Sequence, residues 1–186
     1  MAIDDLIQDA ERRMHKSVEA AQAEFSTLRT GRASPALLDR VQIDYYGQQT
    51  PLKQLATISA PEPRMLTIQP FDPNSVATIE RAIQESDLGL TPSNDGKLIR
   101  LPIPQLTEER RKDLVKVVRQ RAEDGKVAVR NVRRDTMKHL EELVRKGEVG
   151  DDDERRSEER VQKLTDEHVH KIDDLLKRKE AEIMEV

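Results

Sequence analysis

The sequence predicts an α+β protein in which an elongated three-helix bundle carries an inserted small α/β domain. Two observations lead to this prediction. Three long segments, 1–29, 108–146 and 151–184, carry apolar residues at steps of three and four, the period of an amphipathic helix. Between the first two segments the composition changes, because all nine prolines lie between Pro35 and Pro104. No single helix can bury its own apolar stripe, so the three are expected to pack together.

The ends of the predicted helices carry recognisable signals. They are Thr107 as an N-cap with Glu108 and Glu109 in the first turn, Gly147 and Gly150 in a turn, and Asp151 to Asp153 as the cap of the last helix. Side-chain oxygens at an N-cap accept hydrogen bonds from the first free amides of a helix, and acidic side chains suit its positive end. These signals predict a break between the second and third helices and a sharp start for each.

The middle of the chain predicts a small domain of short strands and one helix. The β-prone runs are 41–46, 55–59, 65–69 and 98–101, and Asp72 with Pro73 opens a helix that ends near Glu85. The bundle is therefore expected to comprise 1–30 and 106–186, and the inserted domain 31–105. The chain crosses between them twice, and the residues expected to act as a hinge are Gly31, Ser34, Pro35, Pro102 and Pro104.

The composition suits long, solvent-covered helices better than a large globular core. Charged residues make up 37% of the chain and aromatic residues 2%, and the mean hydropathy is -0.76. The absence of cysteine excludes disulfides, thiolate zinc sites and cysteine nucleophiles. No apolar run approaches the roughly 18 residues of a membrane span, and the first residues do not resemble a signal peptide. A cytoplasmic monomer without membrane contact is expected.

The charge is distributed very unevenly along this chain. The formal net charge is -4, yet residues 110–146 carry 13 basic and 6 acidic side chains, a net charge of +7. Residues 147–186 carry a net charge of -6. Because salt screens exposed charges beyond about 8–10 Å, a local basic strip can bind phosphate within an acidic protein.

On a helical wheel, the basic residues of 108–146 lie broadly opposite its apolar residues. Ion pairs with neighbouring helices would explain such a face, but pairing alone does not require an excess of seven positive charges. The cluster Arg130 to Arg134 is rich in arginine, whose planar guanidinium matches phosphate oxygens in a bidentate way. The chain has no tryptophan and only two adjacent tyrosines, so recognition of RNA backbone shape is expected rather than base stacking.

Other patterns give little sign of catalysis or of a metal site. His168 and His170 are two residues apart, which directs them to different sides of a helix, and His168 falls in the apolar series. Asp151 to Asp153 lack the spacing of a calcium loop, and Ser34 has no neighbouring histidine base. No glycine-rich phosphate loop is present. We therefore expect no catalytic residue, metal or cofactor, and place any GTPase activity in a partner.

Several motifs together resemble the ribosome recycling factor family across essentially the whole chain. They are Arg29-Thr30-Gly31-Arg32-Ala33-Ser34-Pro35, Tyr45-Tyr46-Gly47, Thr50-Pro51-Leu52, Ser86-Asp87-Leu88-Gly89-Leu90, Leu106-Thr107-Glu108-Glu109-Arg110-Arg111-Lys112 and Val129-Arg130-Asn131-Val132-Arg133-Arg134-Asp135. The combination is highly specific, although each piece alone is weak. Asp124-Gly125, inside the second long helix, is a departure that predicts a local loss of helix stability of roughly 1 kcal/mol relative to alanine.

The resemblance implies an L-shaped molecule, in which a flexible elbow joins the bundle to the α/β domain. It implies a translation factor, not an enzyme, that binds the large ribosomal subunit and its 23S-type rRNA. It further implies that, with elongation factor G and GTP, the factor disassembles the post-termination ribosome and releases it from mRNA. Arg133 matches the arginine on which the family relies for binding, and Arg32, Arg130 and Arg134 match further rRNA-facing positions.

Two other classes of function remain open at the level of sequence. A helical scaffold could use the charged bundle as a protein-binding surface, and its binding would depend on apolar contact more than on salt. An enzyme would need a pocket holding a perturbed acid–base pair. The basic segment, with its strong expected salt dependence, favours the RNA-binding factor over both.

Overall fold

The computed structural model describes residues 3–185, so the first two residues of the predicted first helix and residue 186 of the predicted bundle lie outside the described residues. The chain forms two compact units. One unit comprises the chain up to Phe25 together with the chain from Lys112 onward, and the other is Ser26–Arg111. The boundaries expected from the sequence, after residues 30 and 105, lie about five or six residues away from these.

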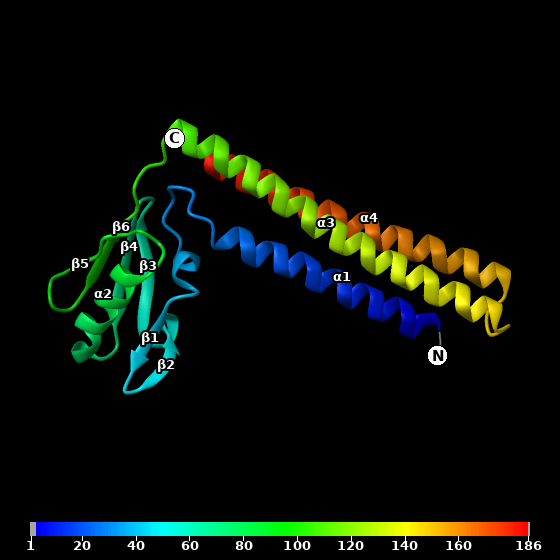
Figure 1. Cartoon of the computed structure of the whole chain (residues 1–186), viewed down its shortest axis with the longest axis horizontal. Helices are drawn as coiled ribbons and strands as arrows, with labels where there is room; N and C mark the ends of the chain where they lie inside the picture. The colour runs from blue at the N-terminus through cyan, green and yellow to red at the C-terminus, as the bar shows by residue number, and fades with distance from the viewer. Residues whose placement is uncertain (1–2, 186) are drawn as a thin grey trace. The chain divides into compact units, whose positions relative to one another are not determined.

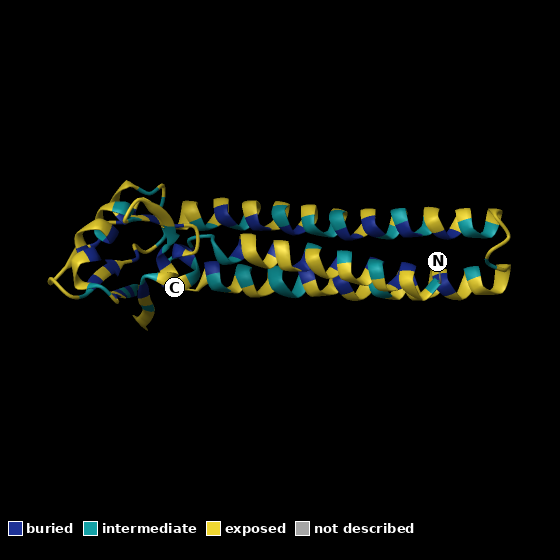
Figure 2. Cartoon of the chain, turned by 90° about the horizontal axis from the view of Figure 1, so that it is seen from below, coloured by how far each residue is buried: buried dark blue, intermediate teal, exposed yellow. Residues whose placement is uncertain are grey.

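The first unit consists of three long helices, α1 (Ile3–Ser26), α3 (Glu108–Arg145) and α4 (Asp151–Met184), which run side by side (Figure 1). With 38 residues at 1.5 Å each, α3 is about 57 Å long. Figure 2 shows one buried stripe along each helix and exposed residues on the remaining faces. The predicted periodicity is confirmed, and the buried apolar side chains are Leu6, Ile7, Ala10, Met14, Val18, Ala21 and Phe25 on α1, Leu114, Val118, Ala122, Val129, Val132 and Leu140 on α3, and Val161, Ile172 and Ile183 on α4.

Polar contacts also join the three helices. Each pair of helices shares an ion pair: Arg13 with Asp135 at 3.0 Å, Lys126 with Asp173 at 2.5 Å, and Arg160 with Asp4 at 3.0 Å. Most of these side chains are partly exposed, so each pair is worth at most about 1 kcal/mol. They specify which faces of the helices meet more than they stabilise the bundle.

The polar residues inside the bundle bond to the backbone of their own helix. The hydroxyls of Thr136 and Thr165 donate to the carbonyls four residues earlier, each at 2.8 Å. The side chain of His168 is only 3% exposed, and its Nδ1 lies 2.7 Å from the Leu164 carbonyl oxygen. The prediction that His168 is a bundle residue is confirmed. Among the described residues, no buried side-chain nitrogen or oxygen lacks a partner, as stable interiors require.

Gly125 does not break α3, which continues through it as one helix. A Cβ built on Gly125 would lie 3.3 Å from Ile172 Cδ1 on α4 and 3.4 Å from Ala21 Cβ on α1. The absence of a side chain therefore lets three helices approach closely at this level. The helix-propensity cost expected from the sequence is offset by this packing.

We expect Gly125→Val to destabilise the protein by about 1–3 kcal/mol, because its two γ-methyl groups would overlap Ile172 and Ala21 in a packed interior. Gly125→Ala is the matched control. Its gain in helix propensity, about 1 kcal/mol, opposes a slight crowding, so its stability should remain near that of the parent. Urea unfolding followed by circular dichroism measures both. Equal stability of the two variants would show that the helices are not in close contact here.

The start of α3 agrees with the sequence prediction, and the start of α4 differs from it. Thr107 caps α3 as predicted, since its hydroxyl oxygen accepts a hydrogen bond from the Arg110 amide at 3.1 Å. The prediction that Asp151 to Asp153 cap α4 is wrong. Gly150 occupies the N-cap without a side-chain hydrogen bond. The three aspartates form the first turn, where their negative charges interact favourably with the positive end of the helix dipole.

The second unit is built on two antiparallel sheets. Strands β1 (Gln42–Tyr45) and β2 (Gln48–Pro51) form a hairpin. Strands β3 (Ala56–Glu62), β4 (Met65–Pro70), β5 (Ser93–Asn94) and β6 (Ile99–Pro102) form a four-stranded sheet in the order β3-β4-β6-β5. The unit also contains helix α2 (Val76–Glu85) and the 3-10 helices η1 (Pro35–Leu38), η2 (Leu52–Gln54) and η3 (Pro73–Ser75).

This unit has a hydrophobic core of its own. The core residues are Ala33, Leu37, Leu38, Val41, Ile43, Leu52, Ala56, Leu66, Ile68, Val76, Ile79, Ile83, Leu90, Ile99, Leu101 and Ile103. Asp72 acts as the predicted cap, because its carboxylate accepts a hydrogen bond from the Asn74 amide at 2.9 Å. The helix that it opens starts with the 3-10 turn η3 and continues as α2.

The two adjacent tyrosines differ in exposure because Tyr45 ends strand β1 and Tyr46 lies in the turn that follows it. Tyr45 is half-buried and its hydroxyl donates to Asp72 at 3.2 Å, while Tyr46 is 83% exposed. Burial, followed by the hydrogen bond to Asp72, raises the pKa of the Tyr45 phenol. Tyr46 lies in the turn after β1, with a positive φ of 52°, and its ring contacts the Tyr45 ring edge-on at 4.5 Å between centroids.

In the described part of the chain, no helix is long and apolar enough to cross a membrane.

Candidate nucleic-acid interface

The side of α3 that faces away from the bundle core carries a row of basic side chains. The exposed members are Lys112, Lys116, Arg119, Arg130 and Arg134. They follow the spacing that placed them opposite the buried apolar residues of the same helix, so this part of the sequence prediction is confirmed. The row is the largest local excess of positive charge in the chain, because residues 110–146 carry a net +7.

Three of the basic side chains of α3 are engaged in ion pairs. Arg119 Nε lies 2.6 Å from Glu180 on α4, and Arg130 Nη1 lies 3.3 Å from Glu123 on α3 itself. Lys126, which pairs with α4 at 2.5 Å, also lies 3.8 Å from Glu123. The ion-pairing explanation therefore holds for these residues. It does not account for the whole excess, since the described residues provide no ion pair to Arg134, Lys116 or Lys138.

Arg133 is held differently from its neighbours. It is half-buried, and its Nε donates a hydrogen bond to Gln162 Oε1 on α4 at 2.8 Å. It lines a groove of about 590 Å³ between α3 and α4, whose other lining residues are Met137, Glu141, Glu154, Arg155, Glu158, Glu159 and Gln162. No carboxylate of the described residues forms an ion pair with Arg133. Its positive charge is thus oriented by a neutral amide at the edge of an acidic groove.

The structure brings together three of the four arginines singled out by the sequence. Arg130, Arg133 and Arg134 lie within five residues of one helix, and Arg130 and Arg134 are separated by about one turn. Arg32 is exposed in the other unit, in the segment between α1 and η1. These four residues are the candidate phosphate-binding set. The sequence missed Gln162, which is 29 residues from Arg133 and becomes its neighbour only through the packing of α4 on α3.

At the first crossing, the predicted hinge residues have defined local roles. Gly31 adopts a positive φ of 82°, and a Cβ there would lie 3.4 Å from Leu106 Cγ at the second crossing. Ser34 caps η1, accepting a hydrogen bond from the Ala36 amide at 3.3 Å, and Pro35 is the first residue of that helix. The Ala33 amide also donates to the Pro63 carbonyl at 2.6 Å, so the backbone is held in place from Ala33 onward.

At the second crossing, Pro102 is the last residue of β6 and pairs with Met65. The next amide, of Ile103, donates to the Arg64 carbonyl at 2.8 Å. Pro104 is exposed and lies outside every helix and strand. Any bending at this crossing is thus expected after Ile103, in the segment that leads to α3.

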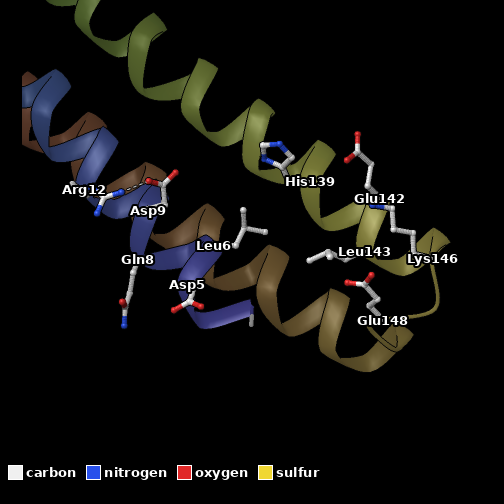
Figure 3. A pocket seen from close by; sticks show the side chains of 10 residues that line it. All are labelled: Asp5, Leu6, Gln8, Asp9, Arg12, His139, Glu142, Leu143, Lys146 and Glu148. Carbon is white, nitrogen blue, oxygen red and sulfur yellow. Dashed lines mark hydrogen bonds and ion pairs between the residues drawn. The ribbon is translucent and has the colours of Figure 1, made fainter. Parts of the chain in front are cut away.

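A second cleft, of about 790 Å³, lies between the first half of α1 and the C-terminal end of α3 (Figure 3). Its lining residues are Asp5, Leu6, Gln8, Asp9, Arg12, His139, Glu142, Leu143, Lys146 and Glu148. Arg12 and Asp9 form an ion pair within it. Its walls carry four carboxylates and two basic side chains, and the described residues contain no group of three side chains suited to bind a metal ion. The cleft offers no concentrated positive surface comparable to that of α3.

Comparisons with known proteins agree on one family. Residues 21–184 match the family model described as Ribosome recycling factor. The ribosome-recycling factor of Rubrobacter xylanophilus is 59% identical over 180 residues, which cover 97% of each chain. That of Halalkalibacterium halodurans is 58% identical over 182 residues, which cover 98% of each chain.

Solved structures give the same match. A solution structure of the ribosome recycling factor is similar with a TM-score of 0.81 at 44% identity, covering 100% of this chain and 99% of that one. A structure of the T. thermophilus ribosome recycling factor, described with E. coli elongation factor G as bound to the E. coli post-termination complex, is similar with a TM-score of 0.72 at 46% identity. That match covers 100% of both chains.

Proposed function

The chain belongs to the ribosome recycling factor family, and we propose that it binds the post-termination ribosome and, with elongation factor G and GTP, promotes its disassembly and release from mRNA. The observation that carries this proposal is the 59% identity to a ribosome-recycling factor over 97% of both chains. The similarity to a factor described together with elongation factor G on a post-termination complex supports the choice of partners. The chain acts as a translation factor rather than an enzyme, and elongation factor G supplies the GTP hydrolysis.

The proposed ribosome contact is the exposed basic side of α3, facing 23S-type rRNA of the large subunit. Arg130, Arg133 and Arg134 would bind backbone phosphates, with Arg32 adding a contact from the other unit. Arginine suits this role because its fork of N–H donors matches two phosphate oxygens at once. The chain has only four aromatic residues, two tyrosines and two phenylalanines, which favours recognition of RNA shape over base stacking.

The two units are proposed to divide the work. The bundle, residues 1–30 and 106–186, would hold the large subunit, while the inserted domain, residues 31–105, would be displaced when elongation factor G acts. The two crossings would serve as the hinge, with bending proposed near Gly31, which has a positive φ, and near Pro104, which lies outside every helix and strand. Such a factor would work in the cytoplasm, where ribosomes are recycled.

Ribosome splitting, followed by light scattering, tests this proposal. Purified post-termination ribosomes are mixed with the protein, elongation factor G and GTP, and then with each component omitted in turn. We expect a fall in scattering only when all three are present, because the protein itself is proposed to have no GTPase activity. Splitting without elongation factor G, or no splitting with the complete mixture, would refute the proposed function.

A further inference from the structure

Arg133 is connected to α4 through a two-step chain of hydrogen bonds. Its Nε donates to Gln162 Oε1 at 2.8 Å, and Gln162 Nε2 donates to Asp166 Oδ1 at 2.9 Å. An ionised carboxylate only accepts hydrogen bonds, so Asp166 requires the NH2 group of Gln162 to point toward it. The amide oxygen of Gln162 must then point the other way, toward Arg133. The order of the chain is therefore determined by chemistry as well as by distance.

This contact occupies one of the five N–H donors of the guanidinium and leaves the paired donors of Nη1 and Nη2. Those are the donors that form the bidentate fork with a phosphate. A side chain fixed at Nε also loses less rotational freedom when its outer nitrogens bind a ligand. The observed geometry thus orients Arg133 without using the atoms that would contact RNA.

Gln162 also leaves the charge of Arg133 uncompensated. Arg119 and Arg130 are paired with carboxylates at 2.6 and 3.3 Å, whereas Arg133 is bonded to a neutral amide. A carboxylate at position 162 would be isosteric and would hold the same nitrogen, but it would cancel the positive charge. Four glutamates line the groove beside Arg133, and none of these described residues forms an ion pair with it.

We infer that Gln162 is a positioning residue, which holds the Arg133 guanidinium through Nε while keeping its charge available to an rRNA phosphate. This inference rests on the proposed function, because it assigns a role to Gln162 only through the contact that Arg133 makes with the ribosome. A purely structural link between α3 and α4 would have a different requirement. It would be served equally well, or better, by a glutamate, which forms a charge-assisted bond to arginine.

The test measures binding of the full-length protein to large ribosomal subunits for Gln162→Glu, Gln162→Ala, Arg133→Ala and the double variant Arg133→Ala/Gln162→Glu. We expect Arg133→Ala to bind about tenfold or more weakly. Gln162→Glu should approach that loss, and Gln162→Ala should lose about fivefold, the cost of ordering one flexible side chain on binding. The double variant should bind no more weakly than Arg133→Ala, since Gln162 acts only through Arg133.

Gln8→Glu is the matched control, because it adds the same charge to an exposed position on α1. It should bind like the parent protein. Gln162 is itself exposed, so the midpoint of urea unfolding of its variants should be at the same urea concentration as that of the parent protein. Parent-like binding by Gln162→Glu, together with weak binding by Arg133→Ala, would overturn the inference and leave the proposed function standing.

Two further outcomes would also overturn it. If Gln162→Glu weakens binding by the same factor with and without Arg133, its effect is a general charge effect and not positioning. If Arg133→Ala binds like the parent, the proposed contact surface is wrong, and the role of Gln162 fails with it.

Discussion

A protein in which residues 31–105 are replaced by a short linker is expected to fold, to bind large ribosomal subunits, and to lose ribosome splitting completely. The physical reason for folding is that each unit has its own core. The bundle buries apolar residues from all three of its helices, and the 16 core residues of the small unit all come from the segment 33–103. Each core can therefore form from the residues of its own unit.

The loss of splitting follows from the proposed division of work. The shortened protein retains Arg130, Arg133 and Arg134, but lacks the domain that elongation factor G is proposed to displace. Light scattering measures the splitting and co-sedimentation measures the binding, with circular dichroism as the check of helix content. Splitting by the shortened protein at the rate of the whole chain would show that the insertion is not needed. Loss of binding would show that the bundle is not the main contact.

The substitution Arg133→Ala is expected to weaken binding to the large subunit by about 1.5–3 kcal/mol, the value of a hydrogen bond to a charged group. This corresponds to a dissociation constant about 10- to 150-fold higher. The fold should be retained, because Arg133 is only half-buried and, among the described residues, its one hydrogen bond is to Gln162. A binding titration, together with urea unfolding, separates the two effects.

Arg155→Ala is the matched control for this substitution. Arg155 lines the same groove from α4 and is exposed, but it lies outside the arginine cluster of α3. Its loss should change affinity far less than the loss of Arg133. Equal losses at the two positions would indicate a diffuse dependence on total charge, and no special contact at Arg133.

The long helices were predictable because a stripe of apolar residues along a helix leaves a regular trace in the sequence. The caps at Thr107 and Asp72 were predictable for the same local reason, since each acts on amides two or three residues away. Strands β2 and β5 were missed. The first has no fully buried residue and the second has only two residues, both exposed, so neither shows the alternation by which a half-buried strand is recognised.

The candidate site was predictable only in part. The helical wheel correctly placed Arg130 and Arg134 on the solvent side of α3, because that depends on one helix alone. It could not show that Arg119 pairs with Glu180, 61 residues away, or that Gln162 holds Arg133. Such contacts depend on how two helices are aligned along each other, which the packing of their cores decides.

The central claim is that the basic side of α3 binds the phosphate backbone of the large ribosomal subunit. Co-sedimentation of the whole protein with large subunits, over a series of salt concentrations, tests it most directly. Because each neutralised phosphate releases bound counterions, the logarithm of the association constant should fall linearly with the logarithm of salt. Loss of Arg133 should make that slope shallower by roughly the contribution of one phosphate contact. Binding that is insensitive to salt, or a slope unchanged in Arg133→Ala, would contradict the account.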